Sequence, residues 1–407
     1  MITTRPPPQT ITLMIFLGGF TNNIIPVLVY WLESHYVLDI TTATLLQSCY
    51  FIGYLAMGLP SAYMISRSGH RRVLLNACAL GFIVSLLIVL LPQGISCAWY
   101  FCCIFALACS ITALRVSALP YLAILKNQSN YAGKMSFFLA FDTFGGILAP
   151  MVSTFLIDQS PPSWLTLLRS HSQISILFLM LAGLFGLTYI LTQTTISHDA
   201  YENKTTFTFS QALIIFRRSD IFFGFLRLFL FVGVEFGVVH ELMYHLRKTQ
   251  NFSDAFSASC ISFYWVQMLV GRVFVGSNSR LISDKLLLLT PVLIALLFCL
   301  GYAVLPQNFA WYALLLVGVC NASLYPSIYG VYTRTVPIAM QHYASCICLM
   351  ATSGGACIPL LLSSSIGAKS GGGAFTIIMA SYVRLGCLLL HKVYNTGTRE
   401  DLLEGAS

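Results

Sequence analysis

The feature that most constrains this chain is the recurrence of apolar runs of about twenty residues along nearly its whole length. A run of about 20 apolar residues is long enough to cross a bilayer as a helix. Hydrophobic residues make up 57% of the chain and charged residues 9%, against roughly 25% charged in soluble domains. The sequence therefore predicts an all-α membrane protein. We place twelve transmembrane helices, at 10–32, 43–65, 73–92, 97–122, 132–157, 173–193, 220–246, 256–276, 284–305, 309–333, 341–366 and 374–393.

One hairpin pattern occurs twice, about two hundred residues apart. Each copy has a polar residue five positions before a proline, and each ends on the motif Gly-Gly-x-x-x-Pro. The polar residues are Arg115 and Asn321, and the motifs lie at 145–150 and 354–359. Six spans repeated in the same orientation predict two pseudo-symmetric six-helix bundles, related by an axis along the membrane normal.

A single long polar linker separates the two halves. We expect an N-terminal six-helix bundle at 1–193, a cytoplasmic linker at 194–219, and a C-terminal six-helix bundle with a short cytoplasmic tail at 220–407. Of the 22 Lys and Arg residues, fifteen, with Arg272 among them, fall on the side of the amino terminus or at its interface, four on the other side and three within spans. Because cytoplasmic loops carry an excess of Lys and Arg, both termini are expected in the cytoplasm.

Several classes of function are disfavoured by the same composition. The net charge of +8 is explained by loop placement and needs no nucleic-acid partner. Most of the thirteen cysteines lie in apolar runs, where packing is a better explanation than disulfides or metal ligands. We therefore expect no metal and no cofactor. The chain has no Walker motif and nothing like a channel filter, and nothing suggests an enzyme.

Several segments, in order and spacing, carry a family resemblance over about 17–390. They are LLQSCYFIGYLAMGLPSAYMISRSGHRR (45–72), FDTFGGILAP (141–150), LFVGVEFG (230–237), YWVQMLVGR (264–272), NASLYPSIYG (321–330) and SGGACIP (353–359). Together they resemble the major facilitator superfamily and, within it, the group of fucose and glucose/galactose permeases. The resemblance implies a secondary transporter for a hexose, a deoxyhexose or a similar small polar solute. It further implies alternating access, proton or sodium symport, and a monomer in the lipid bilayer of a cell membrane, the inner membrane in a bacterium.

The chain departs from this group at positions tied to its substrate. Fucose permeases carry acids where this sequence has Asn22 and Arg115, an Asn where it has Asp142, and a Gln where it has Leu139. The resemblance therefore supports the fold, but it does not transfer fucose specificity to this chain.

Arg115 and Asp142 are charges deep inside neighbouring spans. At 1.5 Å per residue they lie roughly 10 and 15 Å from the cytoplasmic end, within reach of one another. One interpretation is a structural ion pair that neutralises both charges. The other is that Arg115 binds a polar or anionic substrate group, since its planar fork suits carboxylates, while Asp142 positions the substrate or takes part in ion coupling. An unpaired Arg115 would favour an anionic solute (a sugar acid, carboxylate or amino acid), and a paired one leaves a neutral sugar possible.

Glu235 lies near the middle of the seventh span and is the main candidate for ion coupling. Carboxylates at such depth mark proton relays in transporters. The alternative is a buried pair with Arg227, two turns away on a similar face. His240 and Glu241 lie nearer the outer end and are expected to be solvated at its mouth.

Uncharged amides occur in spans of both halves and predict a shared central cavity. Amides hydrogen-bond between helices at about 0.6 kcal/mol each, and they also suit sugar hydroxyls because each has a donor and an acceptor. Tyr325 and Trp265 could add an aromatic wall. With Arg115 and Asp142, the predicted substrate-binding residues are Asn22, Asn23, Gln47, Gln267, Asn321 and Tyr325. A transporter-like sensor that binds solute without moving it remains the rival hypothesis from another class.

Overall fold

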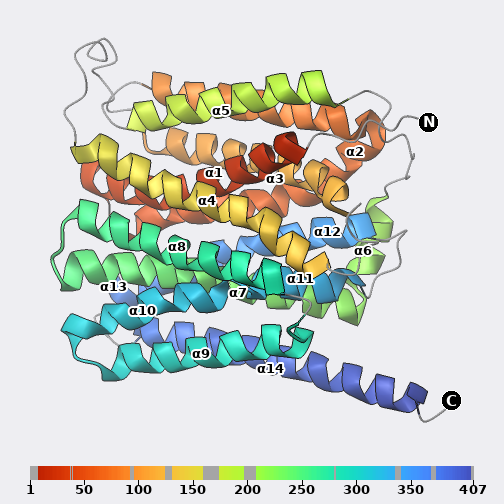
Figure 1. Ribbon diagram of the computed structural model, residues 1–407. Helices are drawn as coiled ribbons and strands as arrows, with labels where there is room; N and C mark the ends of the chain where they lie inside the picture. The colour runs from red at the N-terminus through yellow and green to blue at the C-terminus, as the bar shows by residue number, and fades with distance from the viewer. Residues whose placement is uncertain are drawn as a thin grey trace.

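The computed structural model describes residues 8–36, 38, 40–91, 96–123, 131–158, 174–196, 208–278, 281–334, 341–367 and 373–404. Within these ranges all regular structure is helical, and the long helices run side by side (Figure 1). The helices of the first half are α1 (Pro8–Tyr36), α2 (Ile40–Leu90), α3 (Ala98–Ala123), α4 (Tyr131–Asp158) and α5 (Ile174–Thr195). Those that follow are α6 (Phe209–Phe216), α7 (Ser219–Tyr244), η3 (His245–Thr249), α8 (Asp254–Asn278), α9 (Asp284–Val304), α10 (Gln307–Asn321), α11 (Leu324–Arg334), α12 (Gln341–Met350), η5 (Ala351–Ser353), α13 (Gly354–Gly367) and α14 (Gly373–Glu404).

The predicted spans are recovered, although four of them do not coincide with single helices. The described residues contain 10 helices that are long and apolar enough to cross a membrane. One of them, at 41–90, holds two predicted spans, and a shorter apolar helix at 375–391 corresponds to the last span. The two spans of α2 meet at Gly69, whose φ of 80° and ψ of 160° suit glycine.

The tenth and eleventh spans are interrupted. α10 ends at Asn321 and α11 begins at Leu324, while a 3-10 turn separates α12 from α13. Pro326 explains the first break, because a proline ring clashes with the carbonyl four residues earlier and cannot donate to it. Both interruptions fall within the second copy of the repeated hairpin.

Two bundles pack against each other along two seams. In the first bundle α1 contacts α4 and α2 contacts α3 and α5; in the second, α7 contacts α13 and α14, and α9 contacts α10 and α14. The first bundle occupies the upper part of Figure 1 and the second the lower part. The seams are formed by α4 with α8 and by α2 with α12 and α13. The fold is thus the pair of six-helix bundles that the repeat predicted. The domain boundaries stay a prediction, and α6 lies within the segment expected to be the linker.

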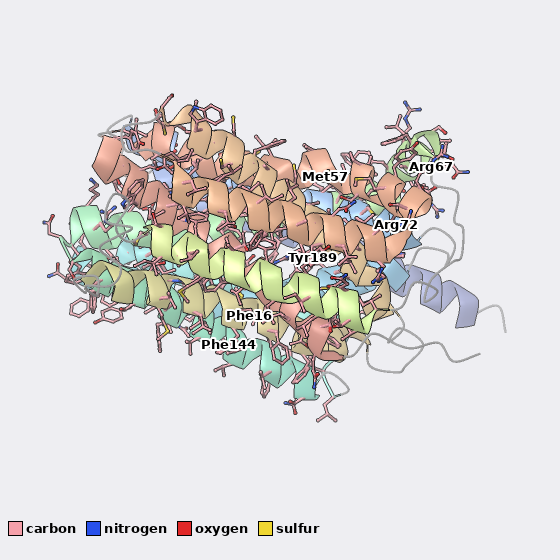
Figure 2. The ribbon with its side chains drawn as sticks, turned by 90° about the horizontal axis from the view of Figure 1, so that it is seen from above. Phe16, Met57, Arg67, Arg72, Phe144 and Tyr189 are labelled. Atoms are coloured by element: carbon pink, nitrogen blue, oxygen red, sulfur yellow. The ribbon has the colours of Figure 1, made fainter. Side chains whose placement is uncertain are left out.

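Glycines allow the closest helix crossing inside each bundle, as their repeated motifs suggested. A Cβ on Gly145 of α4 would lie 2.4 Å from the carbonyl oxygen of Phe16 on α1. The rings of Phe16 and Phe144 lie 6.0 Å apart at this crossing (Figure 2). In the second bundle, a Cβ on Gly354 of α13 would lie 1.8 Å from the carbonyl oxygen of Phe229 on α7.

The figures show which helix termini lie at each end of the molecule. α14 ends at the right of Figure 1, and Arg67 and Arg72 of α2 lie toward that same end in Figure 2. We call the opposite end, at which α1 ends, the far end. Glu33 of α1 lies there, and it pairs with Arg247 and Lys248 of η3 at 3.3 and 3.2 Å. The assignment of the far end to the outside of the cell stays a prediction.

Candidate functional site

Arg115 and Asp142, the two charges predicted to be within reach, form an ion pair. A guanidinium nitrogen of Arg115 on α3 donates to a carboxylate oxygen of Asp142 on α4. Both side chains are largely buried, at 16% and 18% exposed. Gly18 of α1 leaves room for the arginine, because a Cβ there would lie 2.6 Å from its Nε. The pair cancels its own charge inside the first bundle.

Arg272 extends this pair across the seam between the bundles. From α8 its Nη1 donates to the carbonyl oxygen of Leu139 at 2.8 Å and to Oγ1 of Thr143 at 2.5 Å, both on α4. The same nitrogen lies 3.9 Å from Asp142, and Nη2 lies 4.0 Å from Glu235 on α7. Arg115, Asp142, Arg272 and Glu235 therefore form a line of alternating charges from α3 to α7, which we call the charge chain.

Arg272 was counted with the basic residues on the amino-terminal side or at its interface, and that placement stays a prediction. Its side chain is 4% exposed and buried against α4, which the sequence analysis did not foresee. It lies six residues, or about 9 Å, inside the end of α8, and its long side chain points into the seam. The signal was available in the sequence, because Arg272 stands alone in an apolar run just as Arg115 does.

The predicted neighbours of Glu235 also need correction. Arg227 does not approach it: Nε and Nη2 of Arg227 donate to the carbonyl oxygen of Leu388 on α14, at 3.1 and 2.9 Å. Eight residues place Arg227 about 12 Å along the helix from Glu235, so the partner of each is set by the helix facing it. Among the described residues, Oε1 of Glu235 accepts no hydrogen bond, and Arg272 is its nearby cation.

The expectation that His240 and Glu241 are solvated at a mouth was wrong as well. Both are buried, each 5% exposed. Oε1 of Glu241 accepts a hydrogen bond from the hydroxyl of Tyr302 on α9 at 2.8 Å. Tyr302 of α9 therefore covers Glu241, while His240 lies on the wall of the cleft described next.

A small cleft lies between the bundles. Helices α1, α2 and α4 supply one wall, and α7 and α8 supply the other. Its polar side chains are Asn23, Gln47 and His240, and Nε2 of His240 has no hydrogen-bond partner among the described residues. The remaining lining residues are Pro26, Val27, Pro150, Phe236, Val239, Met243, Ala258 and Ile261.

The predicted amide ligands divide into two groups. Asn23 and Gln47 line the cleft. Asn22 instead accepts hydrogen bonds from the hydroxyls of Tyr50 and Tyr54, at 2.5 and 2.8 Å. This arrangement links α1 to α2 and is the packing role that the sequence left open.

Asn321 has the same role in the second bundle. Its Nδ2 donates to the hydroxyl of Tyr264 at 2.8 Å, and its Oδ1 accepts from the hydroxyl of Tyr382 at 2.9 Å. Gln267 donates to the carbonyl oxygen of Leu315 at 3.2 Å. Tyr325 stacks on Tyr329, with ring centroids 6.2 Å apart.

The two bundles, the repeated crossing and the central cleft define the class of this protein, and a family model confirms it. The chain belongs to the Major Facilitator Superfamily, whose model matches residues 11–360.

Curated relatives cover most of the chain. It is 24% identical over 364 residues to a glucose/galactose transporter of Brucella abortus, covering 88% of each chain. It is 20% identical over 370 residues to the L-fucose-proton symporter of Escherichia coli, covering 86% of this chain and 84% of that one.

A solved structure has the same fold. The crystal structure of the major facilitator transporter FucP in its outward conformation superposes with a TM-score of 0.72 at 18% identity. The match covers 96% of this chain and 99% of that one.

Proposed function

We propose that this protein is a secondary active transporter that carries a neutral hexose or deoxyhexose together with a proton by alternating access. The family and the sugars named for its relatives support this class of solute. The observation that carries the choice of a neutral solute is the ion pair of Arg115 with Asp142. Because the arginine already has a carboxylate partner, it offers no free cation to an acidic solute.

The cleft between the bundles is the proposed solute site. Asn23 and Gln47 offer amide donors and acceptors, and His240 adds a nitrogen without a partner in the described residues. Such groups suit sugar hydroxyls, which both donate and accept. Phe236 supplies an aromatic face next to them. Of the residues predicted from sequence, Asn23 and Gln47 are therefore the proposed direct ligands, and His240 joins them.

Glu235 is the proposed proton-coupling residue, at one end of the charge chain. When it is ionised, it attracts Arg272, which holds α8 against α4 across the seam. When it binds a proton, that attraction is lost, and Arg272 is left with its contacts on the first bundle alone. Protonation thus changes how α7 and α8 are tied to the first bundle, and it can bias the two access states. Asp142 faces the same arginine from the other side and would tune this balance.

The protein is proposed to act as a monomer in a bacterial cell membrane, with both termini in the cytoplasm and the far end outside. An anionic solute is the second candidate, and it would have to displace Asp142 from Arg115. A sensor without transport is the third.

Binding and transport assays separate these candidates. In a thermal-shift screen, a ligand at 100 times its dissociation constant stabilises by about 2.7 kcal/mol. We expect glucose, galactose or fucose to stabilise the protein and the matching sugar acids not to. Stabilisation by acids alone, lost in Arg115→Gln, would support the anionic carrier instead.

In proteoliposomes, a proton gradient should drive accumulation of the stabilising sugar. Glu235→Gln should abolish accumulation while solute exchange continues, because the binding cleft is intact and the titrating group is gone. Binding without any exchange in the parent protein would favour a sensor, and unchanged accumulation in Glu235→Gln would make Glu235 structural.

A further inference from the structure

A second buried acid, away from the charge chain, is connected to the surface of the far end by hydrogen bonds. Glu241 lies six residues beyond Glu235 on α7, a rise of about 9 Å. Its Oε1 accepts from the hydroxyl of Tyr302 at 2.8 Å, and that hydroxyl lies 3.3 Å from Nδ1 of His245. These three side chains form a continuous path from the end of α7 into its interior.

The outer end of this path lies at the surface. Nε2 of His245 lies 3.3 Å from the carbonyl oxygen of Gln307 and 3.3 Å from Nε2 of Gln250. Gln250 also donates to that carbonyl at 2.8 Å, in an exposed hydrogen bond. His245 and Glu241 are each 5% exposed, so the path leads from solvent at Gln250 and Gln307 to a buried carboxylate.

The backbone is irregular where the path begins. His245–Thr249 forms a π-helix, η3, directly after α7, and Asn251 has a positive φ of 55°. π-helical turns are uncommon and occur frequently at functional sites. Here the wider turn carries the histidine that the path requires, a second observation independent of the hydrogen bonds.

We propose that Glu241 is a proton-binding site loaded from the far end through His245 and Tyr302. The proposal rests on the proposed proton coupling and adds to it an entry route in the second bundle. None of these three residues belongs to the charge chain or lines the cleft.

The hydrogen bonds that link the three side chains can form in both protonation states, while Oε2 of Glu241 has no partner among the described residues. With Glu241 ionised, the single hydroxyl proton of Tyr302 points to Glu241, so His245 must donate from Nδ1 to the tyrosine oxygen. Nε2 of His245 is then an acceptor, and the amide of Gln250 lies within reach to donate to it. Every donor along the path points toward Glu241.

A proton arriving from solvent bonds to Nε2 of His245 and makes an imidazolium. The Nδ1 proton then passes to the tyrosine oxygen while the tyrosine hydroxyl proton passes to Glu241. The products are a neutral histidine, a neutral tyrosine and a neutral carboxylic acid, so one proton has moved and no charge is left over. Nε2 now donates to the carbonyl oxygen of Gln307, and all donors point outward.

Other titratable groups around the path are few among the neighbouring elements. Arg247 and Lys248 near its entrance each pair with Glu33 of α1, which offsets part of their repulsion of an incoming proton. The remaining helix, α10, contributes the neutral Gln307. The groups concerned are Tyr302 on α9, His240 and Tyr244 on α7, Arg247 and Lys248 on η3, and Glu33 on α1.

Infrared difference spectroscopy of the full-length protein in proteoliposomes tests the site, with a pH jump as the probe. The parent protein should gain protonated-carboxyl absorption on acidification from both Glu235 and Glu241. The part that is missing in Glu241→Gln and kept in Glu235→Gln is the Glu241 band. Tyr302→Phe and His245→Gln should keep the band but form it at least tenfold more slowly, because each interrupts the path without removing the acid. Tyr312→Phe, the same change at a side chain 47% exposed on α10, is the matched control and should form the band at the parent rate.

Carboxyl absorption that is identical in Glu241→Gln and in the parent protein, or a Glu241 band that forms at the parent rate in both path variants, would overturn the proposal. If one path variant fails to fold, the other decides. The assay contains no sugar, so the proton site stands or falls independently of solute transport. A protein that shows the band but moves no sugar would refute the proposed function and leave this inference in place.

Discussion

The two copies of the repeated hairpin share a backbone crossing and differ in charge. A Cβ on Gly19 would lie 1.8 Å from the carbonyl oxygen of Asp142, and a Cβ on Gly354 would lie 1.8 Å from that of Phe229. Yet the first copy carries the buried Arg115, where the second carries the neutral Asn321, held by two tyrosines. The backbone contact that builds each bundle is therefore kept in both halves, and the polar side chains next to it are free to differ.

The second bundle contributes charge from outside the repeat. Its two members of the charge chain, Glu235 and Arg272, lie on α7 and α8, and Arg272 crosses to the first bundle. The difference teaches that the fold is close to symmetric while the electrostatics are not. The first half holds a closed ion pair, and the second half holds the group that can gain or lose an electrostatic partner.

Removing Arg272 should have the largest effect on this asymmetry. Arg272→Met leaves Asp142 and Glu235 without their shared cation and should destabilise the protein by about 3–5 kcal/mol, the usual cost of breaking a buried pair. It should also abolish proton-driven accumulation. Arg272→Lys is the control: it keeps the charge but has one nitrogen in place of the two that face α4 and Glu235, so it should be milder in both thermal unfolding and transport. Equal effects of the two variants would show that charge at this position is unimportant.

The helix crossings at Gly19 and Gly354 should lose similar stability when a methyl group is added to the glycine. Gly19→Ala and Gly354→Ala each force a methyl group into a backbone carbonyl, which cannot rotate away, and overpacking of this kind costs about 1–3 kcal/mol. Gly183→Ala in α5 is the control, because its Cβ would meet nothing within 4 Å. Thermal unfolding in detergent measures all three. A large loss in one crossing and none in the other would contradict the shared design.

The two tyrosine-held amides should also behave alike, with a smaller effect. Asn22→Ala and Asn321→Ala each leave buried tyrosine hydroxyls without their partner, at about 1 kcal/mol each. Neither variant should change the proton dependence of transport, since neither touches the charge chain. Loss of coupling in Asn22→Ala alone would give Asn22 a role that its packing does not account for.

The ion pair at the far end should matter least. Glu33→Gln removes the partner of Arg247 and Lys248, and partly exposed pairs contribute about 0–1 kcal/mol. We expect little change in unfolding temperature and a modest shift toward outward access, measured by cysteine labelling in the cleft. An unfolding shift as large as that of Arg272→Met would mean that the far end, and not the charge chain, holds the bundles together.

The fold was largely predictable from the sequence because the bilayer imposes length and composition on each span. The twelve runs and the repeated motifs were enough for the two bundles. The two predicted spans within α2 are separated at Gly69, whose backbone angles are not helical. The break between α10 and α11 follows from Pro326, which stands inside the tenth predicted span.

The candidate site was less predictable, because it depends on which faces meet. The depths of Arg115 and Asp142 placed them within reach, and their ion pair was one of two interpretations. The alternative pair of Arg227 with Glu235 does not form, because partners on other helices decide the contacts of both residues. The tyrosines around Asn22 and Asn321 were missed for the same reason, as nothing in a single span announces a hydroxyl on the next.

The glycine contacts described above also set where the molecule is stiff and where it yields. Inside each bundle, Gly19 and Gly354 face backbone carbonyls, which cannot rotate away as a side chain can. At the α2 seam, Gly58 and Gly355 face the side chains of Met350 and Phe51, which can change rotamer. The α2 seam can therefore adjust by rotamer changes, while the crossings at Gly19 and Gly354 should keep their distances through a transport cycle. During transport, the side-chain contacts at the α2 seam should therefore change more than the backbone crossings inside each bundle.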